Sequence, residues 1–406
     1  MTAPASSTEW ATGWRIVLAG ALANATGISL LFYTFNLFVL PMAADLHLSR
    51  AQGGQIQSAI IAAAVGAPVI GWLCDRISFH RLFLACTLIM AATEIAIWNG
   101  ASSFAAMFVG TAIIGFIGGG SSTVLITRPI NAHFRRSRGL ALGLVGVGIS
   151  VSTIVASPLM ERVIAIYGWR SGFLALAGVA LVLGLPAAMI LMPRDASTRG
   201  SGGAALPVTH DYLRTADFWL LVAANFCASM ATASAIGQLS PMLQERGLTP
   251  ADAAWGISFF AAGQFVGKLG GGWLLDRFEP RLVAATLNAL PTLGFALLLT
   301  QHSVFLPLML AAGLIGLLQG ADIGVFSYFV AHRFDVSRYG AIFGVMHGLG
   351  WIGNAIALIS VAWSFDRFHG YWAAQLTAIG LLMLTAMLIS RVRLKRDDLA
   401  STAAPL

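Results

Sequence analysis

The stretch Gly71-Trp72-Leu73-Cys74-Asp75-Arg76 is repeated 201 residues later as Gly272-Trp273-Leu274-Leu275-Asp276-Arg277, with five of its six letters unchanged. Each copy closes a long apolar run. Each is followed by one more basic residue, Arg81 in the first copy and Arg281 in the second. A motif that returns at one offset predicts a chain built from two related halves.

The composition is that of a membrane protein. Of the 406 residues, 57% are hydrophobic and only 10% are charged, whereas a soluble domain has about 25% charged residues. Apolar runs of at least about 18 residues can cross a bilayer as helices, because a helix satisfies its own backbone hydrogen bonds. We identify twelve such runs, at about 14–41, 51–74, 81–99, 104–128, 137–160, 170–192, 215–243, 251–275, 281–300, 304–329, 338–364 and 371–391.

The positive charges predict the orientation of the chain, whose net charge is +7. With both termini placed in the cytoplasm, seventeen of the 24 Lys and Arg residues fall on the cytoplasmic side, five on the outer side and two inside helices. Cytoplasmic loops are enriched in Lys and Arg, so this excess indicates topology rather than binding of nucleic acid. We expect a multi-pass protein of the plasma (inner) membrane that has both termini in the cytoplasm and functions as a monomer.

A polar linker divides the apolar runs into two groups of six. It contains Ser197-Thr198-Arg199-Gly200-Ser201-Gly202-Gly203, a composition typical of flexible connections. A parallel repeat of six helices plus six is typical of one large class of secondary transporters. We expect a cytoplasmic N-terminal segment, a first six-helix bundle, a linker, a second six-helix bundle and a cytoplasmic tail, at 1–13, 14–192, 193–214, 215–396 and 397–406.

Glycines recur at intervals of four residues in two of the runs. Gly139 and Gly143 lie in the fifth run, and Gly340, Gly344 and Gly348 lie in the eleventh. This spacing puts each set on one helix face, where we expect backbones to approach closely. Two interpretations stay open, which are static packing of the bundle and a smooth face along which helices slide during gating.

The repeated hexapeptide resembles the loop between helices two and three of the major facilitator superfamily. That loop carries a Gly-x-Leu-x-Asp-Arg pattern with a following basic residue, and both copies match it. The first copy departs from the pattern at Ser78, where glycine is usual, and the second departs at Glu279. The resemblance spans the chain and implies an all-α membrane protein with twelve transmembrane helices in two six-helix bundles related by a parallel repeat.

The resemblance also implies a gating role for the motif. In this superfamily the acid is thought to latch the bundles together across helix eleven, which is near Ser337 and Arg338 here. Asp75 is expected to interact with the positive N-terminal end of a neighbouring helix, and a solvated loop that only sets topology is the alternative. The residues assigned to gating are Gly71, Asp75, Arg76, Arg81, Gly272, Asp276, Arg277 and Arg281.

Other stretches are similar to monocarboxylate transporters and oxalate:formate antiporters. They are Phe134-Arg135-Arg136-Ser137-Arg138-Gly139-Leu140-Ala141-Leu142-Gly143 and Gly320-Ala321-Asp322. In those carriers a cation in helix eight, usually arginine, is implicated in binding the substrate carboxylate. Lys268 takes that place here, eight residues before Asp276, although lysine is a point charge and not a bidentate fork. The alternatives are snorkelling to the inner surface and pairing with a loop acid.

Charged residues inside membrane helices cost about 2.5 to 3.5 kcal/mol to insert, so each is a functional candidate. Asp322 lies about 18 Å from the cytoplasmic end of its helix, near the membrane midplane. It is interpreted either as a proton carrier, whose state could depend on the substrate or on Lys268, or as half of a permanent ion pair. Arg128 either lines the cavity or contacts a loop, and Glu94 is expected to have a structural or solvated role.

Uncharged polar residues complete the expected substrate site. Gln264 lies one helical turn before Lys268 and shares its face. His347 is interpreted either as an interhelical hydrogen-bond partner or as a proton relay. The substrate-binding candidates are Lys268, Gln264, Tyr33, Asn36, Arg128, Tyr328, His347 and Asn354, and the proton-coupling candidate is Asp322.

These features predict a secondary active transporter that moves a small organic anion, a monocarboxylate, with protons by alternating access. One alternative is a proton-driven exporter or antiporter of amphipathic organic compounds, and another is a transport-inactive membrane sensor. The expected partners are the anion, protons and the lipid bilayer, without nucleic acid, metal or cofactor. The sequence contains no phosphate-binding loop, metal-ligand cluster or Gly-x-Ser-x-Gly elbow, so we do not expect an enzyme.

Overall fold

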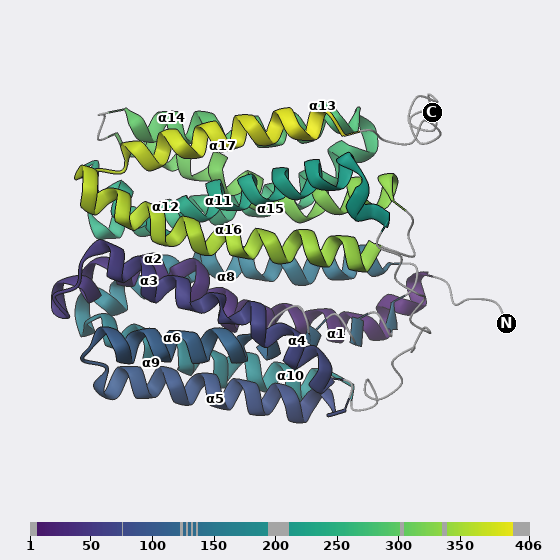
Figure 1. Ribbon diagram of the computed structural model, residues 1–406. Coiled ribbons are helices and arrows are strands. Elements are labelled where there is room, and N and C mark those ends of the chain that lie inside the picture. The colour runs from purple at the N-terminus through teal and green to yellow at the C-terminus, as the bar shows by residue number, and fades with distance from the viewer. Residues whose placement is uncertain are drawn as a thin grey trace. The chain divides into compact units, whose positions relative to one another are not determined.

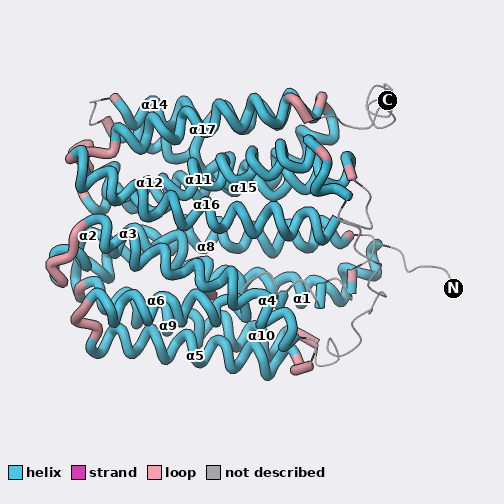
Figure 2. Tube along the Cα trace, viewed as in Figure 1, coloured by secondary structure: helices cyan, strands magenta, loops and turns pink. Residues whose placement is uncertain are grey.

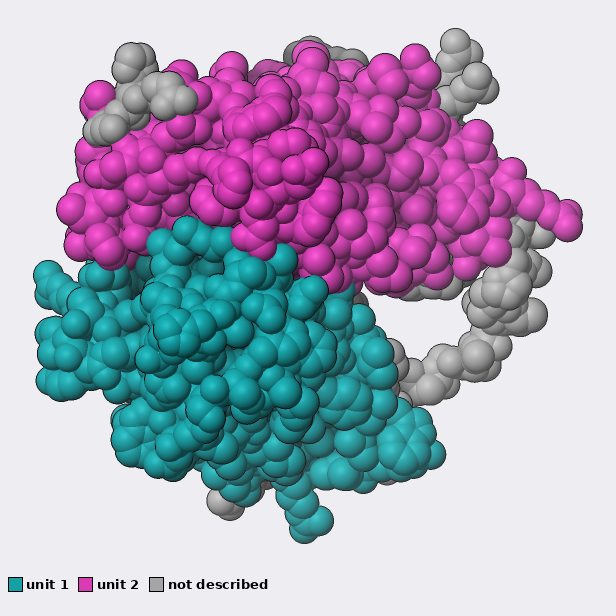
Figure 3. All heavy atoms as spheres, turned by 60° about the vertical axis from the view of Figure 1, so that its left-hand side comes forward, with its two compact units in different colours: residues 1–202 teal, residues 203–406 magenta. Residues whose placement is uncertain are grey.

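The computed structural model describes residues 6–74, 76–121, 125–126, 129–130, 133–134, 137–193, 211–300, 304–334 and 339–392, and all regular secondary structure in these residues is helical (Figures 1 and 2). The chain divides into two compact units, residues 1–202 and 203–406 (Figure 3). The division falls within the stretch 193–214, most of which lies outside the described residues, as does the predicted tail 397–406.

The first unit contains six helical passes, several of them interrupted. Its elements are α1 (Ser6–Thr26), α2 (Ile28–Asp45), α3 (Arg50–Ser58), the 3-10 turn η1 (Ala59–Ile61), α4 (Ala62–Cys74), α5 (Phe79–Gly100), α6 (Phe104–Gly118), the 3-10 turn η2 (Gly119–Ser121), α8 (Arg138–Tyr167), α9 (Trp169–Val179), the π-helical turn η3 (Ala180–Gly184) and α10 (Leu185–Leu191).

Helix one begins earlier than the sequence predicts, at Ser6 instead of residue 14. Its first turns are held by the segment that follows helix four. The Trp10 and Phe134 rings lie 5.0 Å apart, and the Glu9 carboxylate accepts a hydrogen bond from the Ser137 N–H at 3.2 Å. Tertiary contacts therefore extend the helix into a stretch too polar to be predicted as part of a membrane span.

Helix one is interrupted at Gly27, between α1 and α2. A Cβ atom at Gly27 would lie 2.7 Å from the Ser121 carbonyl oxygen, so a larger residue does not fit. The Ile28 N–H, at the start of α2, lies 3.3 Å from the Ser121 hydroxyl, which accepts its hydrogen bond. The interruption thus ties helix one to η2 in helix four, inside the first unit.

The second unit contains the remaining six passes. Its elements are the 3-10 turn η4 (Asp211–Arg214), α11 (Ala216–Glu245), α12 (Pro250–Arg277), α13 (Pro280–Ala289), α14 (Pro291–Leu299), α15 (Phe305–Arg333), α16 (Tyr339–Phe368) and α17 (Trp372–Ser390). Pro291 divides helix nine into α13 and α14, because proline has no N–H to continue the helical hydrogen bonds.

The helices account for all the predicted spans. Ten stretches of the described residues are helical, long enough and apolar enough to cross a membrane. The two predicted spans outside this set are helix two, formed by α3, η1 and α4, and helix eight, formed by α12. Each of these two helices carries one copy of the repeated hexapeptide at its end. Together the two sets make up the twelve membrane passes.

Glycines bring two helix backbones into direct contact in the second unit. A Cβ atom at Gly267 of α12 would overlap the Leu317 carbonyl oxygen of α15. A Cβ atom at Gly316 of α15 would likewise overlap the Phe260 carbonyl oxygen of α12. Small residues allow such close approach in membrane helices. Helices eight and ten therefore form one closely packed pair.

The first unit repeats this contact between helices two and four. A Cβ atom at Gly66 would overlap the Phe116 carbonyl oxygen, and one at Gly115 would lie 2.5 Å from the Ile60 carbonyl oxygen. Both glycines lie 201 residues before their counterparts in the second unit. The duplication seen in the hexapeptide thus extends to backbone packing within each unit.

Several glycines that were expected to mark close contacts do not do so. A Cβ atom at Gly143, Gly344 or Gly348 would meet no other atom within 4 Å. The same holds for Gly272 of the second hexapeptide, whereas a Cβ atom at the preceding Gly271 would lie 3.1 Å from the Ala321 Cβ. The expectation of close packing was wrong at Gly143, Gly344 and Gly348, because their faces of α8 and α16 point away from the neighbouring helices of the unit.

Candidate functional site

Lys268 lies on the buried face of α12. It continues a line of buried residues at helical spacing, formed by Ile257, Ala261 and Gln264, each of which is 1% exposed. The residues of α12 that are about half exposed lie on the opposite side of the helix, and they are Trp255, Val266, Leu269 and Trp273. The position of Lys268 therefore favours a role inside the protein over snorkelling along the exposed face.

Lys268 and Gln264 stand on a rigid support. A Cβ atom at Gly320 of α15 would overlap the Gln264 carbonyl oxygen, and Gly267, next to Lys268, is in backbone contact with the same helix. Binding groups on closely packed helices are held more precisely than groups on loops. The two side chains therefore form a pair of polar groups on one buried face, one helical turn apart.

Asp322 points to the other side of the α12–α15 pair. The two helices run in the same direction, because Gly263, Gly267 and Gly271 meet Gly313, Leu317 and Ala321 in that order. Each residue of a helix is rotated by about 100° from the one before it. When two parallel helices face each other, this rotation has the same sense on both, so the residues that follow the two contact positions point to opposite sides of the pair. Lys268 and Asp322 each follow such a contact residue. The geometry therefore does not bring these two charged groups together.

Tyr328 is held against a histidine near the end of α15. The rings of Tyr328 and His332 stack at a centroid distance of 3.9 Å, with an interplanar angle of 19°. The His332 Nδ1 atom also lies 2.8 Å from the Tyr328 carbonyl oxygen, at hydrogen-bond distance. This stacking, which the sequence analysis did not predict, fixes the orientation of the candidate Tyr328 ring.

His347 belongs to a row of aromatic rings along α16. Its ring stacks on Phe343 at 5.4 Å and meets Trp351 edge to face at 6.5 Å. Asn354 lies seven residues further on the same side of the helix and is partly buried. His347 therefore has a packing role within α16 that neither of its two predicted roles included.

Two candidates in the first unit, Tyr33 and Asn36, lie on α2, which follows the interruption of helix one. The Asn36 side chain donates to the Tyr33 carbonyl oxygen at 2.9 Å, and its Oδ1 atom is buried without a hydrogen-bond partner among the described residues. Asn24, three residues before Gly27, is completely buried, and the described part of the chain offers no partner to either of its amide atoms. The candidate Arg128 lies outside the described residues.

In each hexapeptide the arginine stacks on the tryptophan one helical turn before it. The Arg76 guanidinium lies 3.7 Å from the Trp72 ring centroid, and Arg277 lies 4.8 Å from that of Trp273. Such cation–π contacts contribute about 0.5 to 1 kcal/mol at exposed sites. The sequence analysis missed this function of the motif, although the four-residue spacing of Trp and Arg is the signal for it.

The described residues do not test the predicted latch. Asp75, Ser337 and Arg338 lie outside them, as does the side chain of Asp276. Arg81 is exposed, and Arg281 is partly buried, with an Nε atom that has no partner in the described part of the chain. The gating role of the two motifs therefore stays a prediction.

An ion pair joins two helix ends in the second unit. The Arg333 Nε donates to the Asp217 carboxylate at 2.6 Å, and the Asp217 side chain is only 10% exposed. The pair links the first turn of α11 to the last turn of α15. The sequence analysis missed it, because an acid in a first turn and an arginine in a last turn are favourable in any helix and do not identify each other as partners.

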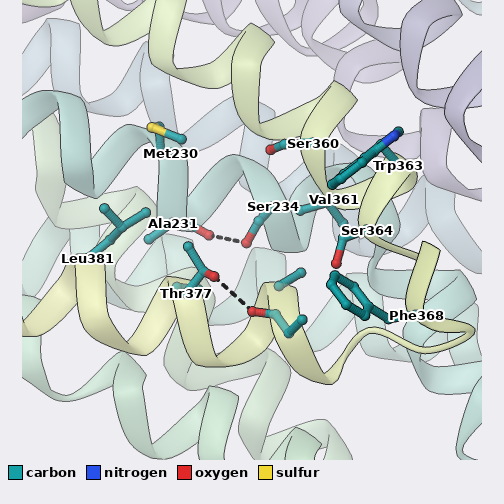
Figure 4. A pocket seen from close by; sticks show the side chains of 13 residues that line it. Met230, Ala231, Ser234, Ser360, Val361, Trp363, Ser364, Phe368, Thr377 and Leu381 are labelled. Atoms are coloured by element: carbon teal, nitrogen blue, oxygen red, sulfur yellow. Dashed lines mark hydrogen bonds between the residues drawn. The ribbon is translucent and has the colours of Figure 1, made fainter. Parts of the chain in front are cut away.

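A cavity of about 240 Å³ lies between α11, α16 and α17 (Figure 4). Hydroxyl groups contribute to its lining, but the Ser234 hydroxyl donates to the Ala231 carbonyl oxygen at 2.6 Å and the Thr377 hydroxyl donates to that of Ala373 at 2.8 Å. These hydroxyls are therefore used within their own helices. None of the residues predicted to bind substrate lines this cavity.

Two matches to one family model cover nearly all of the sequence. The model describes the Major Facilitator Superfamily, and it matches residues 18–235 and again residues 218–405. This chain belongs to the Major Facilitator Superfamily. The double match agrees with the duplication, since the packing of helix two on four and of helix eight on ten is repeated in the two units.

The relatives of this chain are named for different functions. "Probable nitrate/nitrite transporter NarK2" of Mycobacterium tuberculosis is 25% identical, over 91% of this chain and 93% of the relative. "Monocarboxylate transporter 11" of Mus musculus is 24% identical, over 85% and 76%. "Transcription regulatory protein OpdE" of Pseudomonas aeruginosa is 28% identical, over 94% of each chain.

A solved structure of the superfamily has the same fold. It is the crystal structure of a bacterial homolog of the human lysosomal transporter Spinster, in an inward-facing and unoccupied conformation. The TM-score is 0.75 at 15% sequence identity, over 99% of this chain and all of the other. The prediction of an all-α membrane protein with the major facilitator fold is thereby confirmed.

Proposed function

We propose that this superfamily member moves a small organic anion, a monocarboxylate, together with a proton by alternating access in the plasma membrane. The observation that carries the proposal is the placement of Lys268 on the buried face of α12, beside Gln264. The names of two relatives, a nitrate/nitrite transporter and a monocarboxylate transporter, support an anion as the cargo.

A carboxylate substrate fits the chemistry of this pair. An ammonium group inside a membrane protein is costly unless it is neutralised, and a bound carboxylate would supply the opposite charge. Lysine offers three N–H donors and the Gln264 amide offers two, so both oxygens of a carboxylate can be satisfied. A single cation suits a monocarboxylate better than a dicarboxylate, whose second charge would be left without a partner.

Asp322 is proposed as the proton carrier. Its Oδ1 atom is buried, and no described group hydrogen-bonds to it. A buried carboxylate oxygen without a partner is unfavourable, and protonation of the carboxylate removes the charge. Because Lys268 and Asp322 point to opposite sides of the α12–α15 pair, any coupling between anion and proton passes through movement of these two helices and not through a direct ion pair.

The test is counterflow in proteoliposomes, with a panel of short aliphatic, aromatic and dicarboxylic acids at two pH values. Monocarboxylates are expected to exchange, and dicarboxylates are expected to exchange at least about tenfold less, because one unpaired buried charge costs more than about 1.4 kcal/mol. Exchange of amphipathic organic compounds, added to the panel as a second set, in place of the acids would favour the exporter or antiporter. If no compound is exchanged, the transport-inactive sensor is favoured. The name of the relative OpdE, a transcription regulatory protein, supports that alternative.

A further inference from the structure

Asp322 of α15 lies level with the interruption of helix nine. A Cβ atom at Gly294 of α14 would lie 2.6 Å from the Ala311 carbonyl oxygen and 2.9 Å from the Ile315 side chain, which fixes the register between helix nine and α15. Two helical turns toward the predicted cytoplasmic side, about seven residues, lead from Ile315 to Asp322 and from Gly294 to Leu287. Asp322 is therefore at the height of Leu287 and Asn288, just before Pro291.

A second contact shows that Asn288 and Asp322 lie on the same side of the two helices. A Cβ atom at Gly271 would be 3.1 Å from Ala321 and 3.9 Å from the Leu287 side chain, so both residues lie beside this one glycine, in the same hydrophobic cluster. Helix nine and α15 are antiparallel. In antiparallel helices, the residues that follow two neighbouring positions turn to the same side, and the residues that follow here are Asp322 and Asn288.

Both side chains present an oxygen that has no donor. The Asp322 Oδ1 and the Asn288 Oδ1 are buried, and neither has a hydrogen-bond partner in the part of the chain that the structure describes. One N–H of the Asn288 NH₂ group donates to the Ala284 carbonyl oxygen at 2.8 Å, and the Oδ1 atom keeps its acceptor capacity. Asn288 can therefore only accept a hydrogen bond on its Oδ1 side.

The interruption of the helix adds to this surplus of acceptors. Pro291 has no N–H to donate to the carbonyl oxygen of Leu287, four residues before it. The Asn288 Oδ1 and this carbonyl oxygen are both acceptors, which favour a protonated Asp322 over the carboxylate. A protonated Asp322 has one O–H to donate, and the Asn288 amide oxygen is an acceptor at its height and on its side.

We infer that Asn288 is the hydrogen-bond acceptor for the proton carried by Asp322. The inference rests on the proposed proton-coupled transport and adds a partner residue to it. The proton is taken from solution onto the Asp322 carboxylate, is held as an O–H donor toward the Asn288 Oδ1, and returns to solution on the other side of the membrane. Asn288 acts as a positioning residue that stabilises the protonated carboxyl group relative to the carboxylate.

Few other titratable groups surround this position. The helices α14 and α17 contain none. Lys268 on α12 points to the opposite side of the α12–α15 pair. Arg281 lies in the first turn of α13, two helical turns from Asn288 toward the predicted cytoplasmic side. Away from the helix ends, the other titratable groups on α11, α15 and α16 are Cys227, which is buried, Tyr328, which stacks on His332, and His347, which is stacked between aromatic rings. The rest lie near helix ends, and they are Asp217 and Glu245 on α11, Asp252, Asp276 and Arg277 on α12, His332 and Arg333 on α15, and Tyr339, Asp366 and Arg367 on α16.

The test compares Asn288→Leu with Gln375→Leu. Gln375 on α17 is the matched control, because it is another buried amide of this unit with side-chain atoms that have no partner among the described residues. Proton-driven uptake is measured against pH. In Asn288→Leu, the alkaline limit of uptake should move to lower pH by about one unit, the effect of losing one hydrogen bond to the protonated form. Gln375→Leu should keep the profile of the unchanged protein.

Infrared difference spectroscopy gives a second measurement. The unchanged protein should show the carbonyl band of a protonated carboxyl group, which disappears in Asp322→Asn and moves to higher frequency in Asn288→Leu. If Asn288→Leu does not fold, Asn288→Ala is measured in its place with the same expectations. A pH profile and a band position equal to those of the Gln375→Leu control would overturn the inference.

Two outcomes separate this inference from the proposed function. If Asp322→Asn still accumulates substrate when an inward proton gradient is imposed, the proposed coupling itself is wrong. If Asp322→Asn loses accumulation while Asn288→Leu leaves the pH profile unchanged, only the role of Asn288 is wrong. A requirement for Na⁺ in place of the pH dependence would also overturn the inference, because carboxyl and carbonyl oxygens at a helix interruption can hold that cation too.

Discussion

Lys268→Gln should abolish carboxylate counterflow in proteoliposomes under conditions where the unchanged protein exchanges it rapidly. The substitution keeps a polar side chain of similar length but removes the positive charge from the buried face of α12. Removing one partner of a buried, hydrogen-bonded charge pair costs about 2 to 5 kcal/mol. The apparent affinity for the anion should therefore fall by roughly 30-fold to more than 1000-fold, measured as the half-saturating substrate concentration.

Two further variants serve as controls for this result. Lys268→Arg keeps the charge and should retain exchange, although the different shape of its guanidinium group changes the relative rates of the acids in the panel. Arg214→Gln removes one positive charge from an exposed residue of η4 and should have no effect. Unchanged half-saturation in Lys268→Gln would show that the anion binds elsewhere.

Asp322→Asn should separate exchange from proton-driven accumulation. An asparagine cannot gain or lose the proton, but it leaves the size of the side chain unchanged. The variant should therefore still exchange labelled for unlabelled monocarboxylate, and its steady-state accumulation ratio under an inward proton gradient should fall to about one. For one proton per monocarboxylate, the unchanged protein should reach about tenfold accumulation for each pH unit of gradient.

The matched control is Asp252→Asn, in the first turn of α12. Asp252 receives a hydrogen bond from the Thr249 hydroxyl at 2.7 Å on the exposed side of a helix start, and an asparagine there should leave accumulation unchanged. Full accumulation by Asp322→Asn would remove this residue from the coupling mechanism. Loss of exchange as well as accumulation would mean that Asp322 is needed for substrate movement and not for the proton alone.

The fold could be predicted from the sequence because its signals are local and repeated. Length and apolarity define each membrane pass, and the hexapeptide, read at one offset, defines the two halves. The interruption at Gly27 could not be predicted, since it depends on the close approach of Ser121 from a distant helix. The start of α1 at Ser6 was missed for the same reason, because contacts with Phe134 and Ser137 hold a polar stretch in a helix.

The candidate site could be predicted only in part. The shared face of Gln264 and Lys268 follows from their spacing on one helix, and the structure adds that this face is buried. The relation of Lys268 to Asp322 does not follow from spacing, because it depends on the direction and contact residues of two helices. The inference that Asn288 lies level with Asp322 likewise requires the register between helix nine and α15, which is set by Gly294 and Gly271.

The most direct test of the central claim is accumulation of a labelled short monocarboxylate by proteoliposomes under an imposed inward proton gradient at zero membrane potential. Protein-free liposomes measure the diffusion of the undissociated acid. We expect uptake above that background to follow the gradient and to stop when a protonophore collapses it. Uptake equal to that of protein-free liposomes, or uptake that persists after the gradient is collapsed, would contradict proton-coupled transport of an organic anion by this protein.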